Sequence, residues 1–176
     1  MRIWTIGHST RAIDELISLL KENEIKLLAD VRAFPGSKRY PQFNKEALAA
    51  TLSAHGIRYE HFPELGGKRK SNPDSRNTAW RNASFRGYAD YMETEQFQKG
   101  IDRLLSVATE AGATVIMCAE AVWWRCHRSM IADYLKAQGV EVMHVLGAKK
   151  VDPHPYTSAA RIVNGELSYE ANDTLL

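Results

Sequence analysis

The chain has 176 residues, of which 44% are hydrophobic and 25% are charged, and its formal net charge is +2. This length and composition suit one soluble globular domain over residues 1–176, with a core that needs no disulfide staples. The small net charge excludes any argument for a nucleic-acid partner from charge alone.

Membrane and targeting segments are not predicted. No stretch approaches the roughly 20 apolar residues of a membrane helix, and the first ten residues, MRIWTIGHST, lack the apolar core and cleavage site of a signal peptide. We therefore expect a cytoplasmic protein without a membrane partner. The two cysteines, Cys118 and Cys126, are too few for a disulfide framework, which favours reduced thiols or a reactive site.

Strands and helices alternate in the first part of the chain. A short strand is predicted over residues 2–6, and Thr10 is expected to cap the following helix, which has one apolar face. A core strand over residues 25–31 comes next. Asn44 is expected to cap a second helix, and alternating polarity predicts a strand over residues 57–62.

The remainder of the chain continues this alternation. Helices are predicted around residues 88–92, 97–108 and 130–135, and strands over residues 115–119 and 140–145. The Asp-Pro-His-Pro sequence at residues 152–155 predicts a rigid break. Within residues 159–170, the pair Asn164-Gly165 is a strong hairpin signal and predicts a C-terminal ribbon at the edge of the fold.

Strands that alternate with helices imply a mostly parallel sheet wound by right-handed crossovers. We therefore expect an α/β fold, namely a single-domain three-layer sandwich whose central sheet is flanked by helices, with a C-terminal edge hairpin. The residues that follow parallel strands gather along one edge of such a sheet, where ligands bind. His8, Ser9, Arg32, Glu120 and His144 are accordingly expected to approach the turn at residues 126–128.

The segment from residue 118 to residue 128 holds the main candidates for chemistry. Cys126 lies where a helix dipole and nearby arginines lower the pKa of a thiol and make it a nucleophile; alternatively it fills space beneath the turn. Cys118 is interpreted as packing, because it lies in an apolar run. Glu120 is either the ion-pair partner of an arginine or a general acid or base. His8 is a third catalytic candidate.

Other side chains near the same edge favour an anion. Arg32 and Arg128 suit a bidentate grip on a phosphate or carboxylate, and pairing with Asp30 and Glu120 is the alternative. His127 is interpreted either as a base or as a cover for the end of the sheet. The further candidates for contact with an anion or substrate are Ser9, Ser37, Tyr40, Phe43 and Arg125.

A long loop is predicted over about residues 64–84, because glycines, a proline and asparagines interrupt any hydrophobic period. Between Lys68 and Arg86 this basic loop carries six cations against the single acid Asp74, a local excess of five. Such a run is usually a solvated surface, but cations near aromatics such as Trp80 also suit single-stranded nucleic acid. The six cations are Lys68, Arg69, Lys70, Arg76, Arg81 and Arg86.

Six short motifs occur in order between Thr5 and about Tyr169. They are Thr5-Ile6-Gly7-His8-Ser9, Asp30-Val31-Arg32 with Pro35 and Ser37, Leu65-Gly66-Gly67, Tyr88-Ala89-Asp90-Tyr91-Met92, Cys118-Ala119-Glu120 and Cys126-His127-Arg128. Together they resemble the motif series of domain-of-unknown-function family 488 (DUF488). The resemblance implies a compact α/β domain without an assigned reaction, and the association of that family with DNA-repair genes implies a role near nucleic acid.

The leading hypothesis is an enzyme that acts on a phosphate-bearing substrate, a nucleotide or nucleic acid, as a hydrolase or transferase that depends on Cys126 or Glu120. No cofactor or metal is expected, because seven residues separate the cysteines, unlike the ligands of structural zinc sites. One alternative is a non-catalytic nucleic-acid-binding or repair-accessory module. Another is a thiol-redox or metal-binding protein, in which Cys118 and Cys126 would bond under an oxidant.

Overall fold

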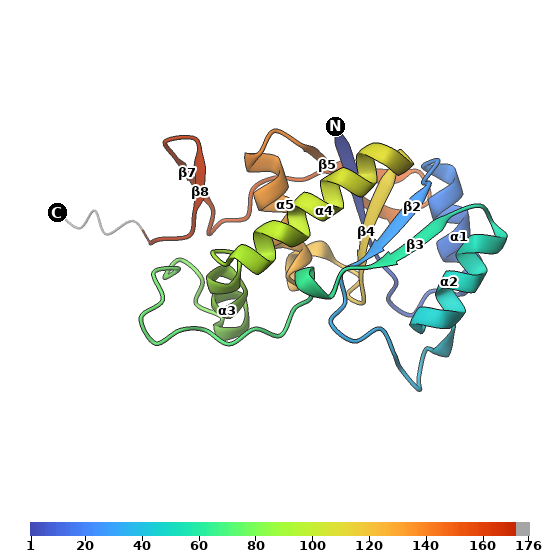
Figure 1. Ribbon diagram of the computed structural model, residues 1–176, viewed down its shortest axis with the longest axis horizontal. Helices are drawn as coiled ribbons and strands as arrows, with labels where there is room; N and C mark the ends of the chain where they lie inside the picture. The colour runs from blue at the N-terminus through green and yellow to red at the C-terminus, as the bar shows by residue number, and fades with distance from the viewer. Residues whose placement is uncertain (172–176) are drawn as a thin grey trace.

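The computed structural model describes residues 1–171. Its main feature is a six-stranded sheet with the order β3-β2-β4-β1-β5-β6, accompanied by a separate two-stranded sheet, β7-β8 (Figure 1). The first five strands run parallel, and β6 pairs antiparallel with β5. The central strands are β1 (Arg2–Gly7), β2 (Leu27–Asp30), β3 (Arg58–His61), β4 (Thr114–Cys118), β5 (Glu141–Gly147) and β6 (Lys150–Pro153).

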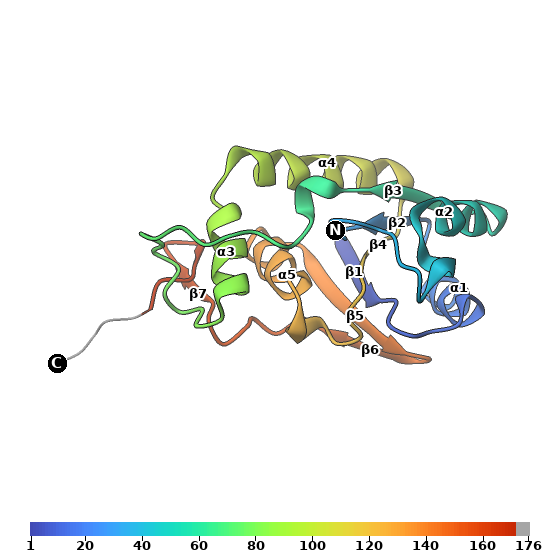
Figure 2. The same cartoon turned by 90° about the horizontal axis from the view of Figure 1, so that it is seen from below.

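Helices cover both faces of this sheet, which confirms the predicted three-layer α/β arrangement. Figures 1 and 2 show α1 and α2 on one side and α4 and α5 on the other. The side chains of β4 alternate between the two cores: Val115 and Met117 pack with α1 and α2, whereas Ile116 and Cys118 pack with the other helices. The helices are α1 (Ile13–Glu22), α2 (Lys45–Ala54), α3 (Ala83–Tyr91), α4 (Glu95–Ala111) and α5 (Arg128–Ala137).

Two predicted caps and one predicted break differ from the structure. Thr10 does not cap α1, which begins after Ala12, because the backbone of His8 and Ser9 first continues the pairing with β4. Asn44 precedes α2, but its side chain accepts a hydrogen bond from the N–H of Ser37 instead of capping the helix. The predicted break at residues 152–155 begins within β6, an edge strand that ends at Pro153 and so tolerates a residue without an N–H.

The C-terminal hairpin is confirmed. It consists of β7 (Arg161–Val163) and β8 (Glu166–Ser168), and Asn164 and Gly165 have φ angles of 53° and 80°, as a two-residue type I′ turn requires. The hairpin forms its own small sheet and does not extend the central one. Within residues 1–171, none of the helices combines the length and apolar character needed to cross a bilayer.

The basic loop has no regular structure between residues 66 and 82, as predicted, but it is anchored to α3. Asp90 accepts hydrogen bonds from the N–H of Asn72 at 2.7 Å, the hydroxyl of Ser75 at 2.5 Å and the side-chain amide of Asn77 at 2.7 Å. Gly87 allows the loop backbone to approach the helix, because a Cβ there would lie 2.1 Å from the carbonyl oxygen of Arg69. The loop therefore has a defined path beside α3.

Candidate functional site

The carboxyl ends of β1 and β4 lie side by side where the chain connections diverge. From β1 the chain passes through α1 to β2 on one side of the sheet, and from β4 it passes through α5 to β5 on the other. Gly7 makes the junction tight, because a Cβ there would lie 1.6 Å from the carbonyl oxygen of Glu120. Open parallel sheets bind ligands at such a point.

A cavity of about 350 Å³ opens at this edge of the sheet, within the size range of small-molecule sites. Five predicted site residues line it: Arg32, Lys68, Glu120, Cys126 and His127. Its other lining residues include the aromatic side chains of Phe34, Phe85 and Tyr88, together with Gly67, Ser84 and Cys118. This is the site cavity. A second cavity, of about 530 Å³, lies beside the C-terminal hairpin, and no cysteine or histidine lines it.

The two cysteine side chains meet at the site cavity. Cys118 ends β4 and is 2% exposed, whereas Cys126 is partly exposed in the turn before α5. Their Sγ atoms are 3.0 Å apart, and the backbone N–H of Arg128 donates to Sγ of Cys126 at 3.2 Å. The interpretation of Cys118 as packing alone was therefore incomplete, since its sulfur is the neighbour of the second thiol.

Arg128 places a buried positive charge beneath this pair. Its side chain is 1% exposed, and it donates to the backbone carbonyls of Glu120 and Ala121 at 3.3 and 3.4 Å. Within residues 1–171 no carboxylate forms an ion pair with it, and its Nε has no hydrogen-bond partner. Arg128 does not line the cavity.

The two thiols are coupled as acids, because their sulfurs are in hydrogen-bond contact. Burial raises the pKa of Cys118, but the hydrogen bond with Cys126 and the charge of Arg128 outweigh burial and lower it. The hydrogen bond with Cys118 and burial raise the pKa of Cys126 well above that of an ordinary thiol, so the predicted lowering by the helix start and the nearby arginines was wrong: the charge of Arg128 does lower this pKa, but the two larger effects outweigh it. Cys118 therefore loses its proton before Cys126 does, and the charge of Arg128 stabilises the resulting thiolate.

His127 is neutral and offers an acceptor nitrogen. Its Nε2–H donates to the carbonyl of Val31 at 2.8 Å, which leaves the lone pair on Nδ1. Burial lowers the pKa of His127 to about 4, the bond to Val31 opposes this, and the charges of Arg128 and Arg69 add to the lowering. Nδ1 faces Gly67, where an added Cβ would lie 3.1 Å from it.

Acid is expected to destabilise the fold through its buried histidines. Burial lowers the pKa of His127 from 6.5 to about 4 and also lowers those of His8 and His144. As the pH falls from 6.5 to 4, the unfolded chain binds protons that the folded chain does not, so the free energy of unfolding decreases. The contribution of His127 to this loss is roughly 3 kcal/mol at pH 4.

Urea unfolding at pH 7.5 and pH 4 measures the effect. His127→Gln should show a smaller loss of stability between these two pH values than the wild type. His55→Gln, at an exposed imidazole, is the matched control and should keep the wild-type loss. An equal loss in His127→Gln and the wild type would contradict the argument.

Glu120 presents an unpaired carboxylate at the cavity. The residue is exposed, and within residues 1–171 its carboxylate has neither an ion pair nor a hydrogen bond; only its backbone carbonyl meets Arg128. Among the described residues, no arginine pairs with the carboxylate of Glu120, so the ion-pair alternative was wrong. A carboxylate that is free beside a thiol can exchange protons with a bound molecule.

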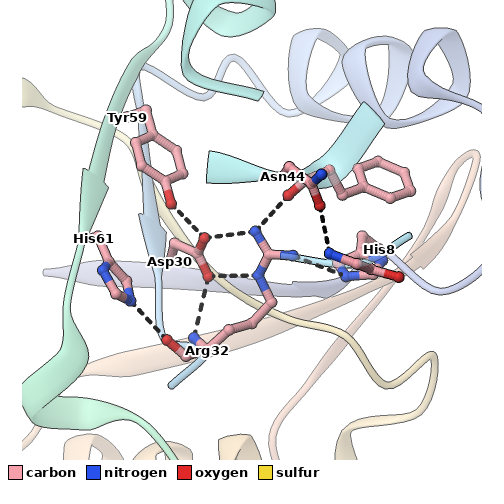
Figure 3. A network of polar contacts seen from close by, with 8 residues as sticks. His8, Asp30, Arg32, Asn44, Tyr59 and His61 are labelled. Carbon is pink, nitrogen blue, oxygen red and sulfur yellow. Dashed lines mark hydrogen bonds and ion pairs between the residues drawn. The ribbon is translucent and has the colours of Figure 1, made fainter. Parts of the chain in front are cut away.

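Arg32, in contrast, is held by its own strand end (Figure 3). Its guanidinium donates to the two carboxylate oxygens of Asp30 at 2.9 and 2.7 Å and to the carbonyl of Phe43 at 2.7 Å. Tyr59 adds a hydroxyl donor to Asp30 at 2.5 Å. Arg32 lines the cavity, but its guanidinium is paired with Asp30. This is the alternative that the sequence left open beside anion binding.

His8 is part of the same network. Its Nδ1–H donates to the carbonyl of Ser9 at 2.9 Å, so Nε2 is the acceptor that faces Arg32 at 3.3 Å (Figure 3). Burial lowers the pKa of His8, and the charge of Arg32 acts in the same direction. The ring stacks on Phe43, with 4.4 Å between centroids. His8 is thus buried behind the cavity and does not line it.

The other predicted contact residues do not line the cavity. Phe43 is 1% exposed, so its ring is not open to a ligand. The hydroxyl of Ser37 accepts from the backbone N–H groups of Arg39 and Tyr40 and shapes the loop after β2. The residues of this group are Ser9, Ser37, Tyr40, Phe43 and Arg125, of which Ser37 and Arg125 are exposed.

Some cations of the basic loop contact other side chains or the backbone, and some are exposed to solvent. Arg69 lies 3.7 Å from the ring centroid of Tyr91, and Arg76 pairs with Glu93 at 2.5 Å. Arg86 donates to the carbonyl of Trp80. The exposed cations of the group are Lys68, Lys70, Arg76 and Arg81. Of the six cations, Lys68 lines the site cavity, so it is the one best placed to meet a bound anion.

His144 does not reach the cavity. It lies within β5, where Nδ1 meets the hydroxyl of Thr5 at 2.5 Å and Nε2 meets Nδ1 of His154 at 2.8 Å. Its ring stacks on Trp123 at 4.6 Å between centroids. His144 thus approaches the turn, since the charge of Arg128 contributes to lowering its pKa, but its side chain points into a buried network and not into the cavity.

The aromatic walls of the cavity are the feature that sequence reasoning missed, whereas contact between Cys118 and Cys126 was anticipated only in the thiol-redox alternative. Phe34 follows β2 directly, and an exposed phenylalanine at a strand end is a signal that could have been used. Tyr88 and Phe85 resemble ordinary helix residues in sequence, so no local signal marks them. Residues 1–171 contain no group of three or more histidine, cysteine or acidic side chains arranged to hold a metal ion.

Comparison with known proteins yields one match. A family model described as "Domain of unknown function DUF488" matches residues 12–135. The matched range includes the cavity lining from Arg32 to His127. No curated protein and no solved structure matches the chain significantly.

Proposed function

The chain belongs to the DUF488 family, a domain of unknown function, and we propose from its site geometry that it is a thiol-dependent enzyme acting on a nucleotide or nucleic acid. The observation that carries this proposal is a pair of thiols opening into an aromatic-walled cavity at the divergence of β1 and β4. A hydrolase or transferase is the reaction class that such a nucleophile serves.

Three groups at the cavity have chemical roles in this proposal. Cys126 is the nucleophile, since it is the partly exposed member of the thiol pair and receives a backbone N–H at the start of α5. Because Cys118 is the stronger acid of the pair, the Cys126 thiolate forms when the proton between the two sulfurs lies on Cys118. Glu120 exchanges a proton with the leaving group or with water, because its carboxylate is free. Nδ1 of His127 accepts a hydrogen bond from the substrate.

The walls of the cavity support the substrate class. Phe34 is exposed and Phe85 is partly exposed, so their rings offer a surface on which a planar base can stack, and the buried ring of Tyr88 supports the wall behind them. Lys68 lines the cavity, and its ammonium lies 5.7 Å from the ring centroid of Phe34. One nucleotide can therefore stack its base on Phe34 and place its phosphate near Lys68. Anion binding is assigned to Lys68 because Arg32 is paired with Asp30 and Arg128 is buried. DNA repair or processing is a setting in which such a substrate occurs.

Protection of Cys126 from alkylation tests the binding part. Adenosine monophosphate or a short single-stranded DNA should slow the reaction of Cys126 with iodoacetamide. Phe34→Ala should weaken this protection about tenfold, because a base–aromatic stack is lost. Ile162→Ala, which removes an exposed apolar side chain on the C-terminal hairpin, is the matched control and should leave protection unchanged. Absence of protection by every nucleotide and oligonucleotide would overturn the substrate class.

Turnover of the protecting nucleotide tests the catalytic part. Glu120→Gln should slow it about a hundredfold, the scale of general acid–base catalysis, and Cys126→Ser should abolish it. If both variants retained wild-type turnover, the catalytic roles proposed for Glu120 and Cys126 would be wrong. Binding that falls log-linearly with salt and is indifferent to Cys126 would instead identify a non-catalytic nucleic-acid-binding module.

A further inference from the structure

We propose that Cys118 and Cys126 act together as a reversible dithiol–disulfide pair that exchanges with small disulfides entering the site cavity. This activity goes beyond the nucleophilic role of Cys126, since it uses both sulfurs and does not require a nucleotide. The pair can be considered independently of the substrate class, because each argument below depends only on the thiols and their surroundings.

The geometry brings the sulfurs together before any oxidation. Cys118 is fixed by the pairing of β4 with β1, in which it lies opposite Gly7. Cys126 is fixed by the start of α5, where its carbonyl accepts from the backbone N–H of Ser129 at 3.0 Å. The resulting Sγ–Sγ contact of 3.0 Å means that bond formation needs little movement of either strand or helix.

The unequal exposure of the two sulfurs assigns their roles. Cys126 is partly exposed and lines the cavity, so an external disulfide meets it first. Cys118 is 2% exposed and touches Cys126, so it is placed to attack a bond that has formed on Cys126. One accessible sulfur and one buried sulfur in contact are what a two-step exchange requires.

Charge favours the reactive form of the pair. The guanidinium of Arg128 is buried and has no ion pair with a carboxylate in the part of the chain that the structure describes, and its Nε lacks a hydrogen-bond partner. A buried cation without a counter-ion is costly. A thiolate shared between the two sulfurs supplies that negative charge, and a thiolate is the species that attacks disulfides.

The exchange balances with a small disulfide, RS–SR, as the oxidant. The Cys126 thiolate attacks one sulfur of RS–SR, which forms a Cys126–SR mixed disulfide and releases RS⁻. The Cys118 thiolate then attacks the Cys126 sulfur, which forms the Cys118–Cys126 disulfide and releases the second RS⁻. The protein loses two electrons and two protons, and the protons convert the released thiolates to two RSH. Formation of the bond also removes the nucleophile of the proposed enzyme.

Incubation of the reduced full-length protein with glutathione disulfide tests the proposal. Thiol titration should fall from two free thiols to none, and mass spectrometry should find a Cys118–Cys126 linkage without retained glutathione. In Cys118→Ala the glutathione adduct on Cys126 should persist at least tenfold longer than in the wild type. Cys126→Ala should react at least tenfold more slowly than the wild type, because the remaining thiol is buried. Excess dithiothreitol should restore both wild-type thiols.

Two results would overturn the inference. One is a wild-type protein that keeps both thiols free or retains glutathione on Cys126. The other is a Cys118→Ala adduct that clears as fast as in the wild type. The wild-type measurement decides the question even if Cys118→Ala does not fold. Nucleotide protection is measured on the reduced protein without glutathione, so failure of the exchange and failure of the proposed function are distinguishable.

Discussion

Replacing Asp133 with asparagine is expected to lower the free energy of unfolding by roughly 3–5 kcal/mol. The carboxylate is completely buried and accepts from His154 Nε2–H at 2.8 Å and from the hydroxyl of Tyr169 at 2.7 Å. Thr157 adds its N–H at 3.0 Å and its hydroxyl at 2.6 Å. An asparagine would turn an N–H group toward donors, so buried polar atoms would be left unsatisfied.

The effect should be large because Asp133 ends a chain of directed hydrogen bonds. Since His154 donates Nε2–H to Asp133, its Nδ1 accepts from Nε2–H of His144, whose Nδ1 accepts from the hydroxyl of Thr5. The chain joins β1, β5, the segment after β6 and α5. Tyr169 connects the segment after the C-terminal hairpin to the same carboxylate.

Urea denaturation at pH 7 measures the change in the free energy of unfolding. Asp102→Asn is the matched control, since it makes the same chemical change at an exposed position on α4, and it should alter stability by less than about 0.5 kcal/mol. If Asp133→Asn were as stable as Asp102→Asn, the hydrogen-bond network around Asp133 would not stabilise the fold.

Replacing Asp30 with asparagine is expected to cost a comparable 3–5 kcal/mol, an order-of-magnitude figure for breaking a buried ion pair. Asp30 is completely buried and receives the guanidinium of Arg32 through both oxygens, with Tyr59 as a further donor. Its removal leaves the cation of Arg32, itself 9% exposed, without a counter-charge at the cavity wall.

A double-mutant cycle separates the ion pair from the rest of the site. Asp30→Asn with Arg32→Met removes both charges and should be less destabilised than Asp30→Asn alone, because no unpaired charge remains buried. Glu141→Gln, which breaks the exposed pair with Arg2, is the control and should cost less than about 1 kcal/mol. A double variant as unstable as the sum of the single variants would exclude coupling between Asp30 and Arg32.

Measuring both stability and nucleotide protection distinguishes a structural role of Arg32 from a role in anion binding. If Arg32 acts mainly by pairing with Asp30, Arg32→Met should lower stability while changing nucleotide protection of Cys126 by less than about twofold, an expectation based on its bidentate contact with Asp30. Lys68→Met should weaken that protection without a loss of stability, because Lys68 is exposed and lines the cavity. If Arg32→Met weakened protection and Lys68→Met did not, Arg32 would be the residue that binds the anion.

Local sequence was sufficient for the elements and for the edge of the sheet that carries the cavity. The apolar run before Cys118 and the helical spacing after Arg128 are local patterns, and backbone hydrogen bonding converts them into β4 and α5. Parallel strands then place Arg32, Glu120, Cys126 and His127 at one cavity, because the residues after each strand lie at the same edge.

Side-chain partners depended on contacts between distant segments. His144 is in a strand whose position was predicted, yet its ring meets Thr5 and His154, which the sequence gives no reason to connect. The loop from residue 66 to residue 82 has no period in the sequence, but Asp90 determines its path. Local periodicity specifies which face of an element is apolar; it does not specify which polar groups meet across elements.

The sequence by itself therefore determined the order of the strands and helices apart from β6, the three-layer α/β class and the presence of a thiol at the carboxyl edge. Only the tertiary structure decided that Cys118 touches Cys126, that Arg128 lies beneath them without a carboxylate, and that Arg32 is bound by Asp30. The physical reason is that helices and strands arise from hydrogen bonds and burial patterns within short segments, whereas the chemistry of a cavity depends on which side chains meet after those segments pack.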